Sequence, residues 1–386
     1  MKRAEFTNKA AGDLVDILVG EDRALAFVPA PLPPDYDPGS VPFAAAVEAR
    51  GQLGELVGQA RRAQNLALIT RPLEWRDAIS SNRIEGTYTE PMAVLLSEAG
   101  KRPTDPVRAA DIQEVQNHFR AYQFGRDALE KGAPLSLHLI RSLHGELLRG
   151  VRGSDRHPGE VRQVPVFIGS EVGGFKGARF VPPPPEQLDP LLDDFSRFIE
   201  SKPSFTALID VAIQHYQFEV IHPFKDGNGR TGRLLIPLYL LSQGDLDRPV
   251  LYLSPFFEIE RDEYVTRLKR VSTEGAWEEW VLFFLRAITT QVRDARDRIE
   301  VVDGLYASYK ELAMRSAGSK AAVPAVDLVL ENVVVTVPQL AKYVGCHPST
   351  AKKALEELSG LGIVEPVDDS RPQAWVAQEL VARVYE

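Results

Sequence analysis

The sequence is poor in the features that mark secreted, membrane-spanning or nucleic-acid-coating proteins. Cys346 is the single cysteine, so no intrachain disulfide can form and a reducing compartment is expected. No apolar run approaches the ~18 residues that a membrane span needs, and Asp13 and Asp16 interrupt the stretch that a signal peptide would use. Acidic residues outnumber basic ones, 54 to 45, which argues against coating nucleic acid as the main task. We therefore expect a cytoplasmic protein with no membrane partner.

The apolar pattern predicts a mainly α protein. At 386 residues the chain exceeds one usual domain, so two or three folded units are expected. Apolar residues at helical spacing predict helices over about 43–69, 72–86, 106–131, 138–148 and 204–221. The last ~65 residues read helix, tight turn, helix and short hairpin, the order of a winged helix-turn-helix.

Two stretches break the helical pattern. Prolines between Val28 and Pro42 prevent regular helix and favour an extended segment that crosses the surface. From Val161 to Val181, β-forming residues lie on both sides of a Gly-Ser and Gly-Gly region, which predicts a β-hairpin.

The residues most directly suggestive of chemistry are "HPFKDGNGRTGR", positions 222–233. A glycine-rich turn can bring backbone N–H groups against a phosphate, because no Cβ atoms stand in the way. A plain turn between helices would need neither the histidine before the glycines nor Arg230 and Arg233, which share one helix face. The motif therefore indicates a phosphate-binding site.

A dinucleotide-binding turn is an alternative for the same glycines. Gly227, Gly229 and Gly232 satisfy G-x-G-x-x-G, and Asp245 lies where a ribose-binding acid would fall. That fingerprint follows a strand in a βαβ unit, whereas residues 205–221 have helical length and period. The helical context disfavours the Rossmann alternative.

The whole motif matches H-x-F-x-[DE]-G-N-G-R-x-x-R, and the chain resembles the Fic (filamentation induced by cAMP) family. The similarity extends through the preceding helix and the "ARFVPPPP" exit of the 161–181 hairpin. It implies a Fic-type helical bundle with a β-hairpin flap, and transfer of AMP from ATP to a protein hydroxyl. The implied domains are an N-terminal region with an inhibitory helix (1–106), a Fic catalytic core (107–290), a helical linker (291–320) and the winged helix-turn-helix domain (321–386).

The chemistry of such a transfer assigns roles within the motif. A neutral imidazole can remove the hydroxyl proton as the α-phosphate is attacked, and His222 is the candidate. Asp226 would bind Mg²⁺, which neutralises the triphosphate. Amides of 227–229 would form an anion cradle, with Arg230 on the departing phosphates. The implied nucleotide-binding residues are Phe224, Lys225, Asp226, Gly227, Asn228, Gly229, Arg230, Arg233 and Tyr264.

Two of these residues have a structural alternative. Phe224 is expected to anchor the loop in the core. Tyr264 resembles a family tyrosine near the adenine, but a core tyrosine on a helix face fits its pattern equally. His118, His138, His144, His157 and His215 show no metal-ligand spacing and are expected to be structural or surface residues.

A second motif, "SNRIEG" from Ser81 to Gly86, matches the family's inhibitory pattern [ST]-x-x-x-E-[GN]. Alone it is weakly specific, since Gly86 could cap a helix and Glu85 could be solvated. Its place N-terminal to the Fic signature implies that Glu85 pairs with Arg233 and withdraws it from the γ-phosphate. The resemblance thus implies a self-inhibited enzyme.

Two parts of the sequence bear on the partners of the protein, the 161–181 hairpin and residues 321–386. The 161–181 hairpin is expected to accept a target segment as an added strand, although it could simply cover the bundle. A DNA-binding regulator that senses nucleotide is the alternative class, but residues 321–386 carry five Lys and Arg against nine Asp and Glu. DNA binding is therefore not expected, and a homodimer is left open. Transfer of UMP, phosphocholine or phosphate, and removal of AMP, stay open within the enzyme class.

Overall fold

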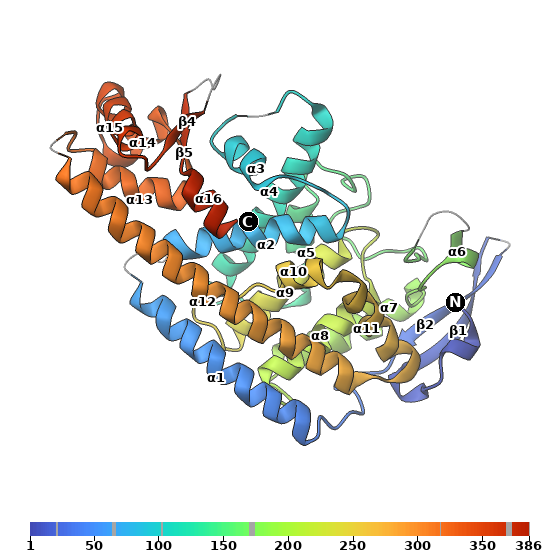
Figure 1. Ribbon diagram of the computed structural model, residues 1–386. Helices are drawn as coiled ribbons and strands as arrows, with labels where there is room; N and C mark the ends of the chain where they lie inside the picture. Colours follow the sequence, from blue (N-terminus) through green and yellow to red (C-terminus); the bar gives the residue numbers. More distant parts are fainter. Residues whose placement is uncertain are drawn as a thin grey trace. The chain divides into compact units, whose positions relative to one another are not determined.

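The computed structural model is mainly helical, with two small antiparallel sheets in the part that it describes (Figure 1). It describes residues 1–20, 22–63, 67–101, 103–169, 174–316, 318–367 and 373–385. Within these ranges no helix is both long and apolar enough to cross a membrane. The chain forms two compact units: the first comprises residues 1–54, 117–247 and 253–291, and the second comprises 55–116, 248–252 and 292–386.

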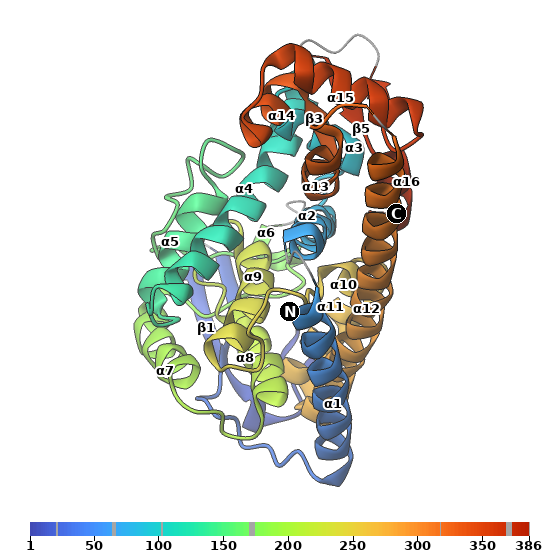
Figure 2. The same cartoon turned by 90° about the vertical axis from the view of Figure 1, so that its left-hand side faces the viewer.

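The first unit is built around the helix α8 (Ala207–Ile221), whose side chains are all buried except that of Glu219. Thr206 begins the helix by accepting the Ile209 N–H. This confirms the predicted central helix. α8 packs against α7, α9 and β2. Figure 2 shows α9 beside α8. The helical elements wholly within this unit are η1 (Arg3–Glu5), η2 (Lys9–Ala11), α5 (Leu137–Leu147), α6 (Gly174–Gly177), η3 (Pro185–Gln187), α7 (Leu188–Glu200), α8, α9 (Asn228–Ser242), α10 (Ser254–Ile259) and α11 (Arg261–Glu274).

An N-terminal hairpin in the first unit was not predicted. Strands β1 (Gly12–Val19) and β2 (Asp22–Pro29) pair antiparallel, and the Phe27 N–H donates to the Val181 carbonyl at 2.9 Å. The strands share a small hydrophobic core with the segment after α6. Its buried members are Ile17, Ala26, Ala178 and Val181. The hairpin therefore supports the segment of chain that runs into the proline stretch.

The segment 161–181 differs from the predicted two-stranded hairpin. In its described part, strand pairing is a single bridge in which the Ile168 and Phe180 N–H groups donate to each other's carbonyls at 2.8 and 3.1 Å. Pro165 lacks an N–H, and prolines follow Val181, so the pairing cannot extend. The predicted turn at 170–173 lies outside the described residues. We call residues 164–183 the flap.

Three long helices have residues in both units: α1 (Ser40–Arg62), α4 (Pro106–Glu130) and α12 (Trp277–Arg315). α1 starts earlier than predicted and β2 reaches Pro29, so the extended segment is confined to about residues 30–39. Pro42 is accommodated in the first turn of α1, where a backbone N–H has no helical partner in any case.

The second unit holds α2 (Ala67–Ile84), which packs against α13. Gly86 follows α2 with φ +87°, and its N–H donates to the Arg83 carbonyl, as the predicted helix end requires. β5 lies between β3 and β4 in an antiparallel sheet. The other elements wholly within this unit are α3 (Pro91–Glu98), α13 (Ala322–Asn332), β3 (Val334–Thr336), α14 (Val337–Val344), α15 (Pro348–Gly360), β4 (Glu365–Val367), β5 (Ala374–Val376) and α16 (Gln378–Val384).

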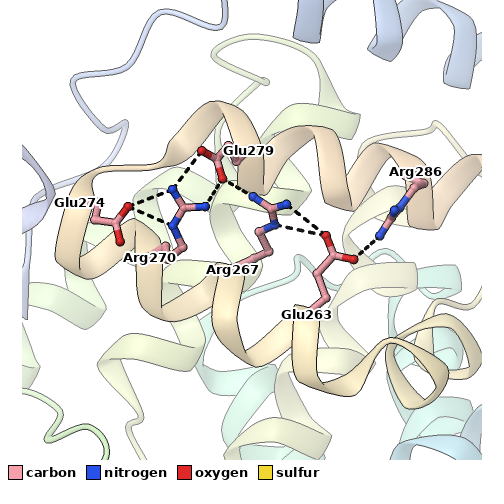
Figure 3. A network of polar contacts seen from close by, with 6 residues as sticks. All are labelled: Glu263, Arg267, Arg270, Glu274, Glu279 and Arg286. Atoms are coloured by element: carbon pink, nitrogen blue, oxygen red, sulfur yellow. Dashed lines mark hydrogen bonds and ion pairs between the residues drawn. The ribbon is translucent and has the colours of Figure 1, made fainter.

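A network of ion pairs joins α11 to the first turns of α12, both in the first unit. Its members are Glu263, Arg267, Arg270, Glu274, Glu279 and Arg286 (Figure 3). Burial alone would raise the pKa of Glu263, but the hydrogen bonds from Arg286 and Arg267 outweigh it and lower that pKa. The side chains are partly exposed, so each pair contributes little to stability and the network mainly fixes the register of α11 on α12.

Candidate functional site

His222 has an uncommon backbone conformation at the end of α8. Its φ of 50° and ψ of 60° lie in the left-handed region, which a side-chain-bearing residue seldom adopts. The following residue is Pro223, and a residue before proline favours an extended conformation instead. The ring is half-buried, with Nδ1 3.2 Å from the Glu219 carbonyl oxygen. Such a backbone persists only where its surroundings hold it, and it clusters at functional sites.

The loop after His222 is closed by the side chain of Asn228. Its Oδ1 accepts the Phe224 N–H at 2.9 Å, and its Nδ2 donates to the Phe224 carbonyl at 2.8 Å. The Phe224 ring is fully buried, as expected of an anchor. Sequence reasoning assigned Asn228 only a backbone role, so this function of its side chain was missed.

The loop leads into the N-terminus of α9. Gly227 precedes the helix with φ 76°, and the first bond of the helix runs from the Thr231 N–H to the Gly227 carbonyl. The residues before Thr231 thus precede the first helical hydrogen bond of α9, and the N-terminus of a helix is a place where an anion can bind. The Gly227 N–H is taken by Asp226 Oδ1 at 2.6 Å. The anion cradle of the 227–229 amides stays a prediction.

Charged side chains flank this helix end. Arg230 and Arg233 are almost wholly buried, and an Arg230 Nη lies 3.7 Å from Asp226 Oδ1. A Cβ at Gly153 would lie 2.7 Å from Asp226 Oδ2, so a glycine leaves room for that carboxylate. A buried guanidinium beside a half-exposed carboxylate suits a ligand that carries several negative charges and a cation.

His144 on α5 holds the loop through two hydrogen bonds to backbone groups, which is one of the structural or surface roles expected for it. Its Nδ1 accepts the Gly159 N–H at 2.8 Å, so the ring proton is on Nε2, which lies 2.8 Å from the Asp226 carbonyl oxygen. Burial, together with the charge of Arg230, lowers the pKa of His144 to about 4, although the bond to Asp226 opposes the shift. His144 is therefore neutral at neutral pH and donates to the backbone of Asp226.

Tyr264 is buried in the core of the first unit. Its hydroxyl is 2.8 Å from Nε2 of His215, whose Nδ1 lies 3.2 Å from the Gly232 carbonyl oxygen. Both side chains are buried, and burial followed by the charge of Arg233 lowers the pKa of His215 to about 3. This placement fits the core alternative for Tyr264, and its contact with a nucleotide stays a prediction.

The residues of the inhibitory pattern lie in the second unit, at the end of α2. Ser81 is buried, Gly86 makes the left-handed turn, and Glu85 is exposed with its N–H donating to the Asn82 carbonyl. The pairing of Glu85 with Arg233 stays a prediction.

Comparisons with known proteins concern most of the chain. Residues 134–240 match the Fic/DOC family model, and residues 43–127 match the model of the Fic/DOC family N-terminal domain. A "Probable protein adenylyltransferase" of Aquifex aeolicus is 30% identical over 188 residues, which are 48% of this chain and 52% of that relative. A "Protein adenylyltransferase Fic" of Nematostella vectensis is 31% identical over 171 residues, 42% of this chain and 36% of the relative. The chain thus spans about half, or less, of these curated relatives.

Solved structures show the same fold. A Fic family protein from Desulfovibrio desulfuricans superposes with a TM-score of 0.55 at 24% identity, covering 89% of this chain and 98% of that one. A Fic domain signaling protein from Bacteroides thetaiotaomicron gives 0.53 at 20% identity, covering 66% and 97%. At these identities the likeness concerns the fold alone.

Proposed function

Because the chain belongs to the Fic/DOC family, we propose that it is a protein adenylyltransferase that moves AMP from ATP to a Ser, Thr or Tyr hydroxyl of a target protein. One observation carries the proposal. His222, which has a left-handed backbone, begins the loop that leads into the N-terminus of α9, and the first two turns of α9 carry the buried Arg230 and Arg233. The group that would remove the proton and the groups that would bind the triphosphate therefore lie at the two ends of one loop.

The proposed reaction uses the chain's own groups as follows. Neutral His222 takes the proton of the attacking hydroxyl while that oxygen bonds to the α-phosphorus, and pyrophosphate leaves. Backbone amides at the N-terminus of α9 and the guanidinium of Arg230 stabilise the negative charge on the phosphates. Arg233 orients the γ-phosphate, so that the bond to pyrophosphate lies in line with the hydroxyl.

The residues present fit Mg²⁺, which would neutralise the triphosphate when bound. Among the described residues no group of three or more His, Cys, Asp or Glu could hold a metal ion. Asp226 offers one half-exposed carboxylate, and Mg²⁺ is commonly bound by one or two carboxylates together with phosphate oxygens. Asp226 would therefore hold the ion as part of a metal–ATP complex.

Self-inhibition is the regulatory part of the proposal. Glu85 pairs with Arg233 and draws it away from the γ-phosphate, which leaves ATP in an unproductive pose. The "SNRIEG" motif and its exposed acid support this role. A carboxylate can bind a guanidinium in bidentate fashion, so the competition with phosphate is chemically direct.

The target is proposed to dock on the flap as an added strand. Val166 lies at the flap's entry, where the described backbone pairing begins two residues later at Ile168. The C-terminal elements α13 to α16, with β3, β5 and β4 in one sheet, support a winged helix assignment. The acidic balance of residues 321–386 favours a protein partner over DNA for this part.

Intact-mass measurement after incubation with ATP and Mg²⁺ tests the proposal. Wild-type protein should gain adenylyl groups slowly, and protein in which His222 is replaced should gain none. Parallel incubations with UTP, GTP and CTP identify the nucleotide. A mass gain of a different group, or loss of AMP from a modified protein in place of gain, would reject the assigned reaction.

A further inference from the structure

Arg162 is a buried arginine whose guanidinium contacts backbone carbonyls from three parts of the first unit. Its side chain is 1% exposed. Nε donates to the carbonyl of His222 at 2.8 Å, and Nη1 donates to that of Val164 at 3.2 Å. Nη2 donates to the carbonyls of Pro183 at 2.6 Å and Ile221 at 3.3 Å. These bonds use four of the five N–H groups that a guanidinium offers.

The arrangement is a favourable one for a buried cation. Ile221 is the last residue of α8, and the carbonyls at a helix C-terminus lack helical partners and carry partial negative charge. Carbonyl dipoles therefore surround the guanidinium. Burial lowers the pKa of Arg162 to about 10, with Glu186 opposing the shift, so the group stays charged at neutral pH.

The same residue holds the backbone of His222 on its carbonyl side. The Arg162 N–H donates to the Pro223 carbonyl at 2.9 Å, in addition to the bond from Nε to His222. Two successive carbonyls after the left-handed turn are thus fixed by one residue. Val164 and Pro183, which accept from the other nitrogens, are the two ends of the flap.

We propose that Arg162 is a positioning residue that sets the place of the flap relative to His222. On the function proposed above, a target hydroxyl docked on the flap would then meet the imidazole at the correct distance. Lysine cannot replace this arrangement, because a single ammonium cannot reach carbonyls that approach a planar fork from different directions. A residue that only filled the core would tolerate that exchange far better.

The test compares Arg162→Lys and Arg162→Ala with Arg197→Lys, an arginine on α7 whose side chain is 74% exposed. Hydrogen exchange measured by mass spectrometry follows peptides of the flap and of residues 218–228. Both Arg162 variants should exchange faster in both segments, and the Arg197 variant in neither. Self-modification with ATP should be slowed roughly 10²-fold in Arg162→Lys, with KM for ATP changed by less than about threefold. Millimolar guanidinium ion should restore part of the rate of Arg162→Ala.

Unchanged exchange and rate in Arg162→Lys would overturn the proposal, as would faster exchange in the flap alone. Faster exchange throughout the chain, with loss of the near-ultraviolet circular dichroism signal, would show that Arg162 serves only general stability and would also overturn it. If no protein, wild type included, incorporates AMP while the two segments respond together, the proposed reaction fails and the coupling of flap to His222 stands.

Discussion

The imidazole of His144 lies flat against the ring of Phe224, with centroids 3.8 Å apart and planes within 7° of each other. The stack joins α5 to the loop that carries the candidate site residues. Together with the bonds of His144 to Gly159 and Asp226, it fixes the loop from one side while the side chain of Asn228 closes it from the other. The loop is thus held in shape before any nucleotide binds, which is the condition for efficient electrostatic stabilisation of a transition state.

We predict that His144→Phe keeps the stack but weakens the site. The variant loses both hydrogen bonds, so the Gly159 N–H and the Asp226 carbonyl lose their buried partner. The free energy of unfolding should fall by about 1–3 kcal/mol, and affinity for ATP should fall with it. Urea unfolding and calorimetric titration with ATP measure the two effects. His138→Phe, at an exposed position on the same helix, should change neither, and equal losses in both variants would contradict the prediction.

We predict that titration of Asp210 on α8 makes the stability of the protein depend on pH. Its carboxylate accepts the N–H groups of Ser204 and Phe205 at 2.6 and 3.2 Å, but burial dominates and raises its pKa to about 6. The folded state therefore holds this proton more tightly than the unfolded chain, in which aspartate titrates near 4. The stabilisation is complete below about pH 4 and is lost as pH rises through about 6, by up to about 3 kcal/mol.

The measurement is the urea midpoint of wild type and Asp210→Asn between pH 4 and 7. His144, whose pKa is lowered, acts in the opposite direction, because its contribution is lost as pH falls from about 6.5 toward 4. In wild type the contributions of Asp210 and His144 to the pH dependence of stability therefore partly cancel. Removing the titration at 210 should leave stability rising with pH across this window, and parallel curves for the two proteins would refute the assignment.

The helices around the site could be predicted because the spacing of their apolar residues determines both their secondary structure and which faces are buried. α8 is apolar nearly all round, so only a central place in a bundle can bury it. The loop residues lie together because they are consecutive in the chain. The N-terminal hairpin was missed although Val15, Ile17 and Val19 alternate as a strand should, since that segment was considered only as a possible signal peptide.

The supports of the site could not be predicted from the sequence. Arg162 and His144 act on carbonyl groups of Pro183, His222 and Asp226, and a carbonyl is the same in every residue. The pattern of side chains in the sequence therefore cannot predict these contacts. The flap shows the opposite case. Its β-forming residues suggested two strands, but there are prolines at both ends and its described residues pair in a single bridge.

Proline substitutions should separate flap shape from target docking. In Val166→Pro the Ile168–Phe180 bridge stays intact, and an N–H at the flap's entry is removed. Ile168→Pro removes the N–H that donates to Phe180. Both should reduce modification of a protein target at least tenfold, with ATP affinity unchanged, and only Ile168→Pro should speed exchange of the Phe180 amide. Equal loss of ATP binding and transfer would point to unfolding.

His222→Ala should abolish transfer while leaving the fold and nucleotide affinity nearly intact. The proposed role of the imidazole is to remove a proton, and loss of a general base lowers the rate by ~10²–10⁴-fold. Its half-buried ring is not part of the fully buried core, so a large loss of stability is not expected. Single-turnover AMP incorporation is the measurement, and His138→Ala is the control. A rate within a few-fold of wild type would assign the proton to another group.

Glu85→Gly should raise AMP transfer, self-modification included, above a weakly active wild type. One guanidinium cannot serve the Glu85 carboxylate and the γ-phosphate in full at once, so removing the acid frees Arg233 to orient the triphosphate. Arg233→Ala should abolish the gain in the double variant. Glu90→Gly is the matched control, because Glu90 is an exposed acid of the same unit whose side chain makes no capping bond to α3. If Glu85→Gly protein stays folded, binds ATP as wild type does and transfers AMP no faster to itself or to lysate proteins, then Glu85 does not inhibit, and a role in hydrolytic removal of AMP becomes the better account of this acid.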